Sequence, residues 1–220
     1  MAERTITALR AQERDSQRVN VFIDGAFAIG VSLTTLTREG LFVGKQLDEA
    51  AWARLEASES SDKALHAALR YLELRPRSVA EVRERLRQKG FAPEPIAAAV
   101  ARLSESGLVD DASFSRLWVE SRQRSRPKGQ FALRAELRRK GIERDTIEAT
   151  LAEQTSPESE RTQAEALARQ NLRKYAAAPD RQSFQRRMGG FLQRRGFAPD
   201  VVMSLVNQLW RELQQNEENV

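Results

Sequence analysis

A short pattern recurs three times along this chain: a leucine, a glycine four residues later and a large apolar residue directly after the glycine. Most residues between the leucine and the glycine are basic. The glycines are 51 and 55 residues apart, and recurrence of one structural unit at a nearly constant period is typical of repeat proteins. The sequence therefore predicts a tandem array, whose repeated turns are Leu86/Gly90/Phe91, Leu137/Gly141/Ile142 and Leu192/Gly196/Phe197.

Each repeat has the periodicity of three consecutive helices. In the first repeat, leucines along one face predict a helix that ends at Pro76, because a proline ring clashes with the preceding turn. Ser78 opens a capping-box sequence, so a second helix is expected from there to Gly90, whose missing Cβ permits the left-handed conformation. A third helix is predicted from Pro93 to Gly107.

The two later repeats are expected to follow the same order. In the second, Phe114, Leu117 and Trp118 are predicted to face the core. Ser156 followed by proline indicates the N-terminus of the third. Because short links join the helices, the predicted fold is mainly α, with tandem three-helix repeats in an elongated, curved array. The predicted repeats are 61–109, 110–155 and 156–220, after a small β-hairpin-containing region at 1–60.

The first 60 residues follow a different pattern. Apolar residues alternate with others on both sides of Asp24-Gly25, which predicts a β-hairpin with a two-residue turn. A similar alternation from Thr5 to Leu9 is compatible with a third strand. From Leu47 onward the helical period returns, and Ser58–Ser61 is predicted to be a short polar linker to the first repeat.

The composition argues against several classes of function. The chain has no cysteine, which excludes disulfides and thiolate chemistry and fits a reducing, cytoplasmic location. No apolar run approaches the roughly 20 residues that a membrane helix needs. His66 is the single histidine and has no triad pattern around it, and there is no glycine-rich phosphate loop. We therefore expect neither an enzyme nor a bound metal or cofactor.

Positive charge gathers in the middle of the chain. Residues 70–145 carry a net charge of +7, whereas the whole chain carries +5. Basic residues four positions apart share an outer helix face, and repeated basic ridges suit a phosphate backbone or an acidic protein groove. The alternative is that they are ordinary solvated helix faces. The candidate binding residues are Arg83, Arg87, Lys89, Arg122, Arg126, Lys128, Arg134, Arg138, Arg139 and Lys140.

The middle of the chain resembles a known family. The run from Gly107 to Asp111, the loop Arg126-Pro127-Lys128-Gly129 and the stretch from Glu136 to Ile142 occur in this order and spacing. Together they resemble the core signature of RecX, the bacterial regulatory protein that acts on the RecA recombinase. The first repeat, with Lys89-Gly90-Phe91, is similar to the preceding repeat of the same family. The resemblance covers about residues 60–210.

The resemblance implies a non-enzymatic function. A RecX-like protein is expected to bind the RecA filament along its groove and to suppress its ATPase and strand-exchange activities. The implied partners are that filament and single- and double-stranded DNA, contacted without sequence preference by a monomer. The third repeat departs from the pattern, because Gly189 stands where Arg83 and Arg134 stand. Two other functions stay open: a stand-alone helical DNA-binding regulator, and a helical scaffold that contacts only proteins.

Overall fold

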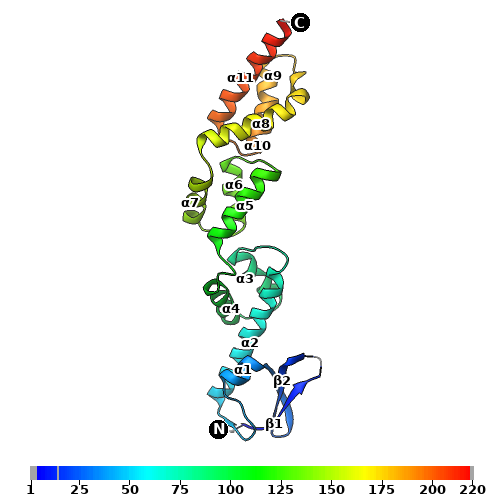
Figure 1. Cartoon of the computed structure of the whole chain (residues 1–220), viewed down its shortest axis with the longest axis vertical. Helices are drawn as coiled ribbons and strands as arrows, with labels where there is room; N and C mark the ends of the chain where they lie inside the picture. Colours follow the sequence, from blue (N-terminus) through cyan, green and yellow to red (C-terminus); the bar gives the residue numbers. More distant parts are fainter. Residues whose placement is uncertain (1–3, 14, 219–220) are drawn as a thin grey trace. The chain divides into compact units, whose positions relative to one another are not determined.

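The structure is a computed structural model that describes residues 4–13 and 15–218. The chain divides between Val109 and Asp110 into two compact units (Figure 1). The first unit holds a small sheet and one three-helix module, and the second holds two further modules. None of the helices in the described part of the chain combines the length and apolar character that crossing a bilayer requires.

The N-terminal sheet has four antiparallel strands in the order β3-β2-β1-β4. Asp24 and Gly25 form the turn between β2 and β3, with φ values of 48° and 83°. Positive φ at both positions matches the twist of the strands, so the predicted hairpin is confirmed, as is the additional strand near the N-terminus. The strands are β1 (Arg4–Gln12), β2 (Asp15–Ile23), β3 (Ala26–Ser32) and β4 (Gln46–Leu47), and the short helix α1 (Leu33–Arg38) follows β3.

A single long helix, α2 (Glu49–Leu72), runs from the sheet into the first module (Figure 1). It begins after Asp48, whose side chain accepts a hydrogen bond from Ala51 N, so Leu47 belongs to the sheet core instead of the helix. The linker predicted at Ser58–Ser61 is wrong, because these residues lie in the middle of α2. The serines resemble a linker locally, but tertiary contacts to the acidic residues beside them hold the helix together.

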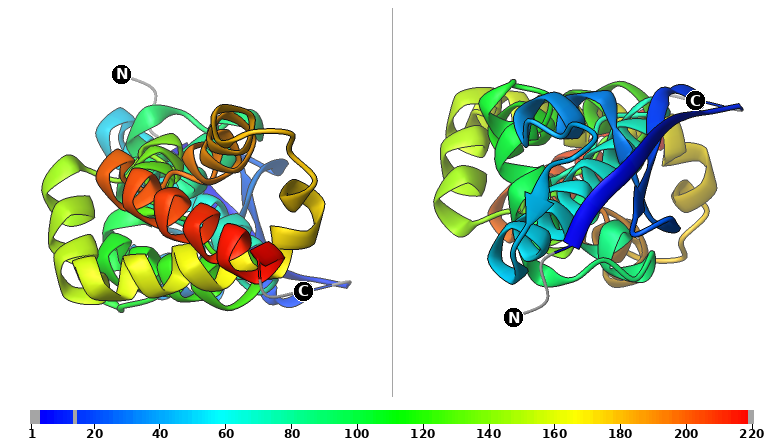
Figure 2. Two further views of the ribbon diagram at one scale, coloured as in Figure 1. Left: turned by 90° about the horizontal axis from the view of Figure 1, so that it is seen from above. Right: turned by 90° about the horizontal axis from the view of Figure 1, so that it is seen from below.

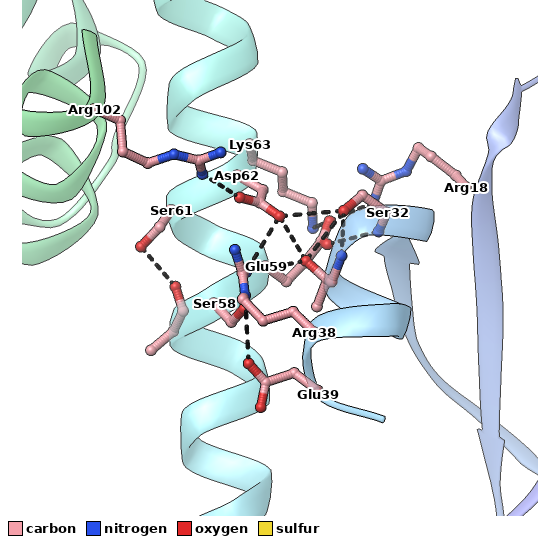
Figure 3. Close-up of polar contacts among 12 residues, drawn as sticks. Arg18, Ser32, Arg38, Glu39, Ser58, Glu59, Ser61, Asp62, Lys63 and Arg102 are labelled. Carbon is pink, nitrogen blue, oxygen red and sulfur yellow. Dashed lines mark hydrogen bonds and ion pairs between the residues drawn. The ribbon is translucent and has the colours of Figure 1, made fainter. Parts of the chain in front are cut away.

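Those contacts form a network that we call the polar clamp, made by Glu59 and Asp62 of α2 with partners from four other elements (Figure 3). Glu59 and Asp62 are only 1% and 4% exposed. Their partners, with donor–acceptor distances, are Arg18 (2.5 Å) and Ser32 N (3.0 Å) for Glu59, and Ser32 Oγ (3.2 Å), Thr35 (2.6 Å), Arg38 (3.3 Å) and Arg102 (2.7 Å) for Asp62. Since removing one partner of a buried ion pair is costly, the clamp fixes the sheet on α2.

Module 1 consists of the second half of α2, α3 (Val79–Gln88) and α4 (Pro93–Glu105). Ser78 forms the predicted capping box with Glu81, in which each side chain bonds the other residue's backbone N–H. This arrangement satisfies donors that a helix N-terminus otherwise leaves free. Val82 and Leu86 of α3 are fully buried against α2 and α4, so the helices surround one apolar core.

Module 2 consists of α5 (Asp111–Ser125), α6 (Gln130–Arg139) and α7 (Arg144–Gln154). Phe114 is buried and Trp118 is half-buried, as expected, but Leu117 is 48% exposed and its predicted core position is wrong. Val119 is fully buried instead. At 3.6 residues per turn, residues i and i+2 point to nearly opposite sides of a helix. Because Val119 faces the core, Leu117 faces solvent.

Module 3 differs in its middle helix. Between α8 (Pro157–Ala176) and α11 (Pro199–Glu218), the chain forms α9 (Arg181–Phe184), a π-helical turn (Gln185–Gly189) and α10 (Gly190–Arg194). The π turn contains Gly189, the residue that breaks the repeat pattern. In the view from above in Figure 2, α8 (yellow) and α11 (orange to red) lie side by side and contact each other. The predicted start at Ser156 is confirmed, because its side chain accepts from Ser159 N.

Candidate binding surfaces

The three leucine–glycine turns have nearly the same backbone geometry. We call them turn 1 (Leu86–Phe91), turn 2 (Leu137–Ile142) and turn 3 (Leu192–Phe197). Each glycine is left-handed, with φ of 83°, 77° and 82°. In each turn the N–H after the glycine donates to the carbonyl of the leucine, at 3.3, 3.1 and 3.3 Å. This closure is how a left-handed residue caps a helix, and it places the same three positions before the glycine at the helix end.

Turn 1 carries an exposed group of cations. Arg83 and Arg87 lie one helical turn apart on α3, and Lys89 ends the helix beside Gly90; all three are exposed. Arg87 lies 2.6 Å from Glu84, but both side chains face water. Exposed pairs of this kind contribute about 0 to 1 kcal/mol, so the pair leaves the Arg87 guanidinium able to bind another anion.

Turn 2 carries a second exposed group. Arg138 and Arg139 end α6 and are exposed. Lys140 is half-buried, and its Nζ lies 4.9 Å from the centre of the Trp118 ring. Arg126, at the end of α5, is also exposed. Turns 1 and 2 therefore share an exposed cation directly after the leucine, Arg87 in one and Arg138 in the other.

A buried carboxylate holds two of the predicted cations in place. Glu136 is 8% exposed and accepts hydrogen bonds from Arg122 Nε (2.8 Å), Trp118 Nε1 (2.9 Å) and the ammonium of Lys128. Burial alone would raise the pKa of Glu136, but the bonds from Lys128, Arg122 and Trp118 outweigh it and lower the pKa. Arg122 also lies over the Trp118 ring at 4.3 Å. Arg122 and Lys128 therefore support the module's interior.

Arg134 is also held by a carboxylate. Its Nε and Nη2 both donate to Glu148 of α7 at 2.7 Å, which is a bidentate arrangement. The hydrogen bond from Arg134 lowers the pKa of Glu148, and the same bond raises the pKa of Arg134. The ridge of Arg134 and Arg138 expected from the sequence is thus divided: the first joins α6 to α7 and the second is exposed.

The sequence contained a signal for these carboxylates that the motif analysis missed. Glu136 lies three residues after Leu133 and directly before Leu137, so it falls on the apolar face of α6. Glu59 lies four residues after Leu55 on the apolar face of α2. An acid inside an apolar stripe needs a cationic partner when the stripe is buried, and that requirement indicates an internal ion pair.

Turn 3 makes an internal contact through its backbone. The carbonyls of Arg195 and Gly196 accept hydrogen bonds from Gly129 N (3.0 Å) and Phe131 N (3.1 Å) at the start of α6. Buried Glu160 of α8 accepts from Gln130 N at 3.1 Å. Module 3 therefore supplies the N-terminal cap of α6, and we call this contact the α6 weld. Gly196 is buried in this contact, whereas Gly90 and Gly141 are exposed, and the side chains of Gln193 and Arg194 in turn 3 stay exposed.

These observations define a class of protein: a sheet-bearing, tandem three-helix repeat protein whose repeated surface feature is a cationic turn. Four family domains match the chain: the Regulatory protein RecX N-terminal domain (residues 4–48) and the first, second and third RecX three-helix domains (residues 64–103, 110–151 and 158–206). The chain is 34% identical to Regulatory protein RecX of Levilactobacillus brevis over 93% of its own length and 76% of that protein. It belongs to the RecX family.

Two further comparisons agree with this assignment. Regulatory protein RecX of Bacillus subtilis is 29% identical, over 97% of this chain and 80% of that protein. A crystal structure of regulatory protein RecX matches with a TM-score of 0.79 and 26% identity, covering 93% of this chain and 99% of the other. The mainly helical fold with tandem three-helix modules after a small sheet is therefore confirmed.

Proposed function

We propose that this protein is a non-enzymatic regulator of the RecA recombinase that binds along the groove of the RecA–DNA filament and suppresses ATP hydrolysis and strand exchange. Membership of the RecX family supports a regulatory role. The binding residues in this proposal are the cations of turns 1 and 2, together with Arg83 and Arg126. Arg122, Lys128 and Arg134 position the surface, because their charges already pair with Glu136 and Glu148.

The observation that carries the proposal is the repetition of one cationic turn in two successive modules. Arg87 and Arg138 occupy the same position relative to Gly90 and Gly141, and both are exposed. A helical filament presents the same acidic and phosphate groups at regular intervals. Two equivalent turns can bind two equivalent places on it, and linked weak contacts sum to a high affinity.

The nucleic-acid part of the function follows from the same charges. Lys and Arg side chains neutralise phosphates without reading the bases, so we propose contacts to single- and double-stranded DNA that are independent of sequence. The protein acts as a monomer in this proposal, since a single chain already carries both turns. We place this activity in the cytoplasm, where its filament partner would be.

The test is RecA-driven ATP hydrolysis on single-stranded DNA, with the protein titrated from substoichiometric amounts. Arg87→Glu with Lys89→Glu reverses the charge of turn 1, and Arg138→Glu with Arg139→Glu reverses the charge of turn 2. Both pairs are exposed, so neither change disturbs a core. We expect the concentration for half-maximal inhibition to rise at least tenfold for each variant, which corresponds to about 1.4 kcal/mol of binding free energy.

The matched control is Arg173→Glu with Lys174→Glu on α8, which makes the same change in net charge on exposed positions outside turns 1 and 2. This control should inhibit like the unchanged protein, because only long-range charge is altered. Inhibition that is unaffected in both turn variants would refute the proposal. An equal loss in the control would assign the effect to net charge and refute the role of the turns. Binding that prefers one DNA sequence would favour a stand-alone regulator instead.

A further inference from the structure

A cleft in the first unit lies between the sheet and module 1, and the turns described above do not account for it. It encloses about 680 Å³. One wall comes from the start of β2 and the end of β3 with the start of α1, and the other comes from α2 and turn 1. Its lining residues are Asp15, Gln17, Arg18, Ser32, Leu33, Thr34, Lys63, His66, Ala67, Arg70, Lys89 and Phe91.

The lining is strongly cationic. Lys63, His66 and Arg70 lie on one face of α2 at helical spacing, and seven residues of helix span about 10 Å. Lys89 adds a charge from turn 1. Asp15 is the one carboxylate among the lining residues. Positive groups such as Lys63, Arg70 and Lys89 on one concave surface raise the local concentration of anions.

The cleft walls are held in place by the polar clamp. Arg18 of β2 donates to Glu59 at 2.5 Å and to the Gly30 carbonyl at 2.8 Å. Lys63 lies 3.5 Å from Glu59, so both cations flank one buried carboxylate (Figure 3). Ser32, where the sheet meets α1, bonds both Glu59 and Asp62. The cleft is therefore preorganised, which reduces the entropy that a ligand must lose on binding.

The remaining two cations have no such partner. Among the side chains that the structure describes, in residues 4–13 and 15–215, no carboxylate lies within ion-pairing distance of Arg70 or Lys89. Both side chains are exposed. They sit on two different elements that border one cleft, so an anion in the cleft could approach both.

We propose that this cleft binds the sugar–phosphate backbone of a single-stranded nucleic acid. Lysine ammonium groups and the neutral donors of Gln17 and Thr34 are typical partners of phosphate oxygens. Leu33 is 40% exposed and Phe91 is half-buried, which gives sugars and bases an apolar surface on the same cleft.

An acidic peptide is the competing occupant. The guanidinium of arginine can bind either a carboxylate or a phosphate through two parallel hydrogen bonds. The Arg18 guanidinium is already engaged by Glu59 and Gly30, so Arg70 alone could bind a carboxylate in this way. The apolar surface of Leu33 and Phe91 beside these cations favours a nucleic acid, whose sugars and bases can pack on it. The inference deepens the proposed nucleic-acid contacts, and it rests on that function only through Lys89, which belongs to both surfaces.

The test uses a variant that avoids turn 1 and the clamp. Arg70→Glu with Gln17→Glu changes one exposed residue on each wall. The matched control, Arg173→Glu with Gln182→Glu, makes the same change in net charge on exposed residues of module 3. Binding of the full-length proteins to a fluorescent oligothymidylate is measured by anisotropy at several salt concentrations, without RecA.

We expect the cleft variant to bind the oligonucleotide about tenfold more weakly at low salt, and the control to bind like the unchanged protein. The slope of log affinity against log salt should fall in magnitude by about 0.7 for each phosphate that the variant no longer neutralises. Affinity and slope equal to those of the control would overturn the proposal. So would a labelled polyglutamate peptide whose binding is abolished in the cleft variant while oligonucleotide binding persists.

The same preparations separate this proposal from the filament function. If the two turn variants lose RecA inhibition while the cleft variant keeps oligonucleotide binding, the filament proposal stands and the cleft proposal fails. If inhibition survives in both turn variants while the cleft variant loses oligonucleotide binding, the cleft site stands and the filament surface fails.

Discussion

The α6 weld leads to a sharp prediction at Gly129. A Cβ added there would lie 2.3 Å from the Gly196 carbonyl oxygen and 2.4 Å from the Phe197 Cα. Both are backbone atoms, so the contact can be relieved only if turn 3 moves away from α6. The backbone at Gly129 has φ −72° and ψ 167°, which any residue adopts. Gly129→Ala therefore tests the close approach of the two modules and introduces no backbone strain.

The magnitude follows from what the weld contains. Moving turn 3 lengthens the two hydrogen bonds from Gly129 N to Arg195 O and from Phe131 N to Gly196 O. Each contributes about 0.5 to 1.5 kcal/mol net, and overpacking a tight contact costs about 1 to 3 kcal/mol. Because relief of the overpacking breaks the bonds, the two costs do not add fully. We expect Gly129→Ala to destabilise the second unit by about 2 to 4 kcal/mol.

The assay is amide hydrogen exchange of the full-length protein, which reports each segment separately and does not require two-state unfolding. Protection should fall at Gly129 to Phe131 and around turn 3, whereas β2 and β3 in the first unit should be unchanged. Gly129→Ser is the matched control for capping, because serine is a better N-cap than alanine but brings the same Cβ. Wild-type protection in Gly129→Ala, or rescue by Gly129→Ser, would refute the steric argument.

Three further predictions concern stability. Burial raises the pKa of Asp62, but bonds from Thr35 and Arg102 with the nearby Arg38 charge outweigh it and lower the pKa. The stability that the Asp62 carboxylate contributes is therefore fully present above its unfolded pKa of about 4, and it is lost as the pH falls through the folded pKa. Urea unfolding should show Asp62→Asn destabilised at pH 7, with the gap to wild type narrowing as the pH falls below about 4; a constant gap would contradict this. Glu136→Gln removes the charge that holds Arg122 and Lys128, and should cost about 2 to 3 kcal/mol in chemical unfolding; a change below about 0.5 kcal/mol would show that the ion pairs add nothing. Val119→Ala should lower stability by about 1 to 3 kcal/mol, whereas Leu117→Ala should change it by less than about 1; equal effects would contradict the burial described above.

Local signals in the sequence predicted most of the secondary structure. The Asp24-Gly25 hairpin, the Ser78 capping box and the left-handed Gly90 and Gly141 turns all form as expected. Each depends on residues within about six positions of one another, so the interactions that stabilise it are present in any tertiary context. The family resemblance rested on the same local strings.

Local reasoning was wrong where a distant residue changed the outcome. Ser58–Ser61 resembles a linker until Arg18 and Arg102 pair with the acids beside it, 41 and 40 residues away along the chain. The burial of Val119 instead of Leu117 likewise depends on which face of α5 meets its neighbours. Neither the helical state of Ser58–Ser61 nor the burial of Val119 can be inferred from the local sequence alone.

The candidate site shows the same division. The sequence identified ten basic residues, and Arg83, Arg87, Lys89, Arg126, Arg138 and Arg139 are exposed. Their binding role stays a prediction. Arg122, Lys128 and Arg134 are tied to carboxylates on other elements, which charge spacing along one helix could not reveal.

The amino-acid sequence by itself determined the three-fold pattern of helices and glycine turns, because helix periodicity, caps and left-handed glycines act within a few residues. Tertiary structure alone decided which copy of the turn joins two modules. Gly90 and Gly141 are exposed, while Gly196 is buried where turn 3 caps α6 through the carbonyls of Arg195 and Gly196. The physical reason is that exposure and ion pairing depend on which distant groups the fold brings within a few ångströms.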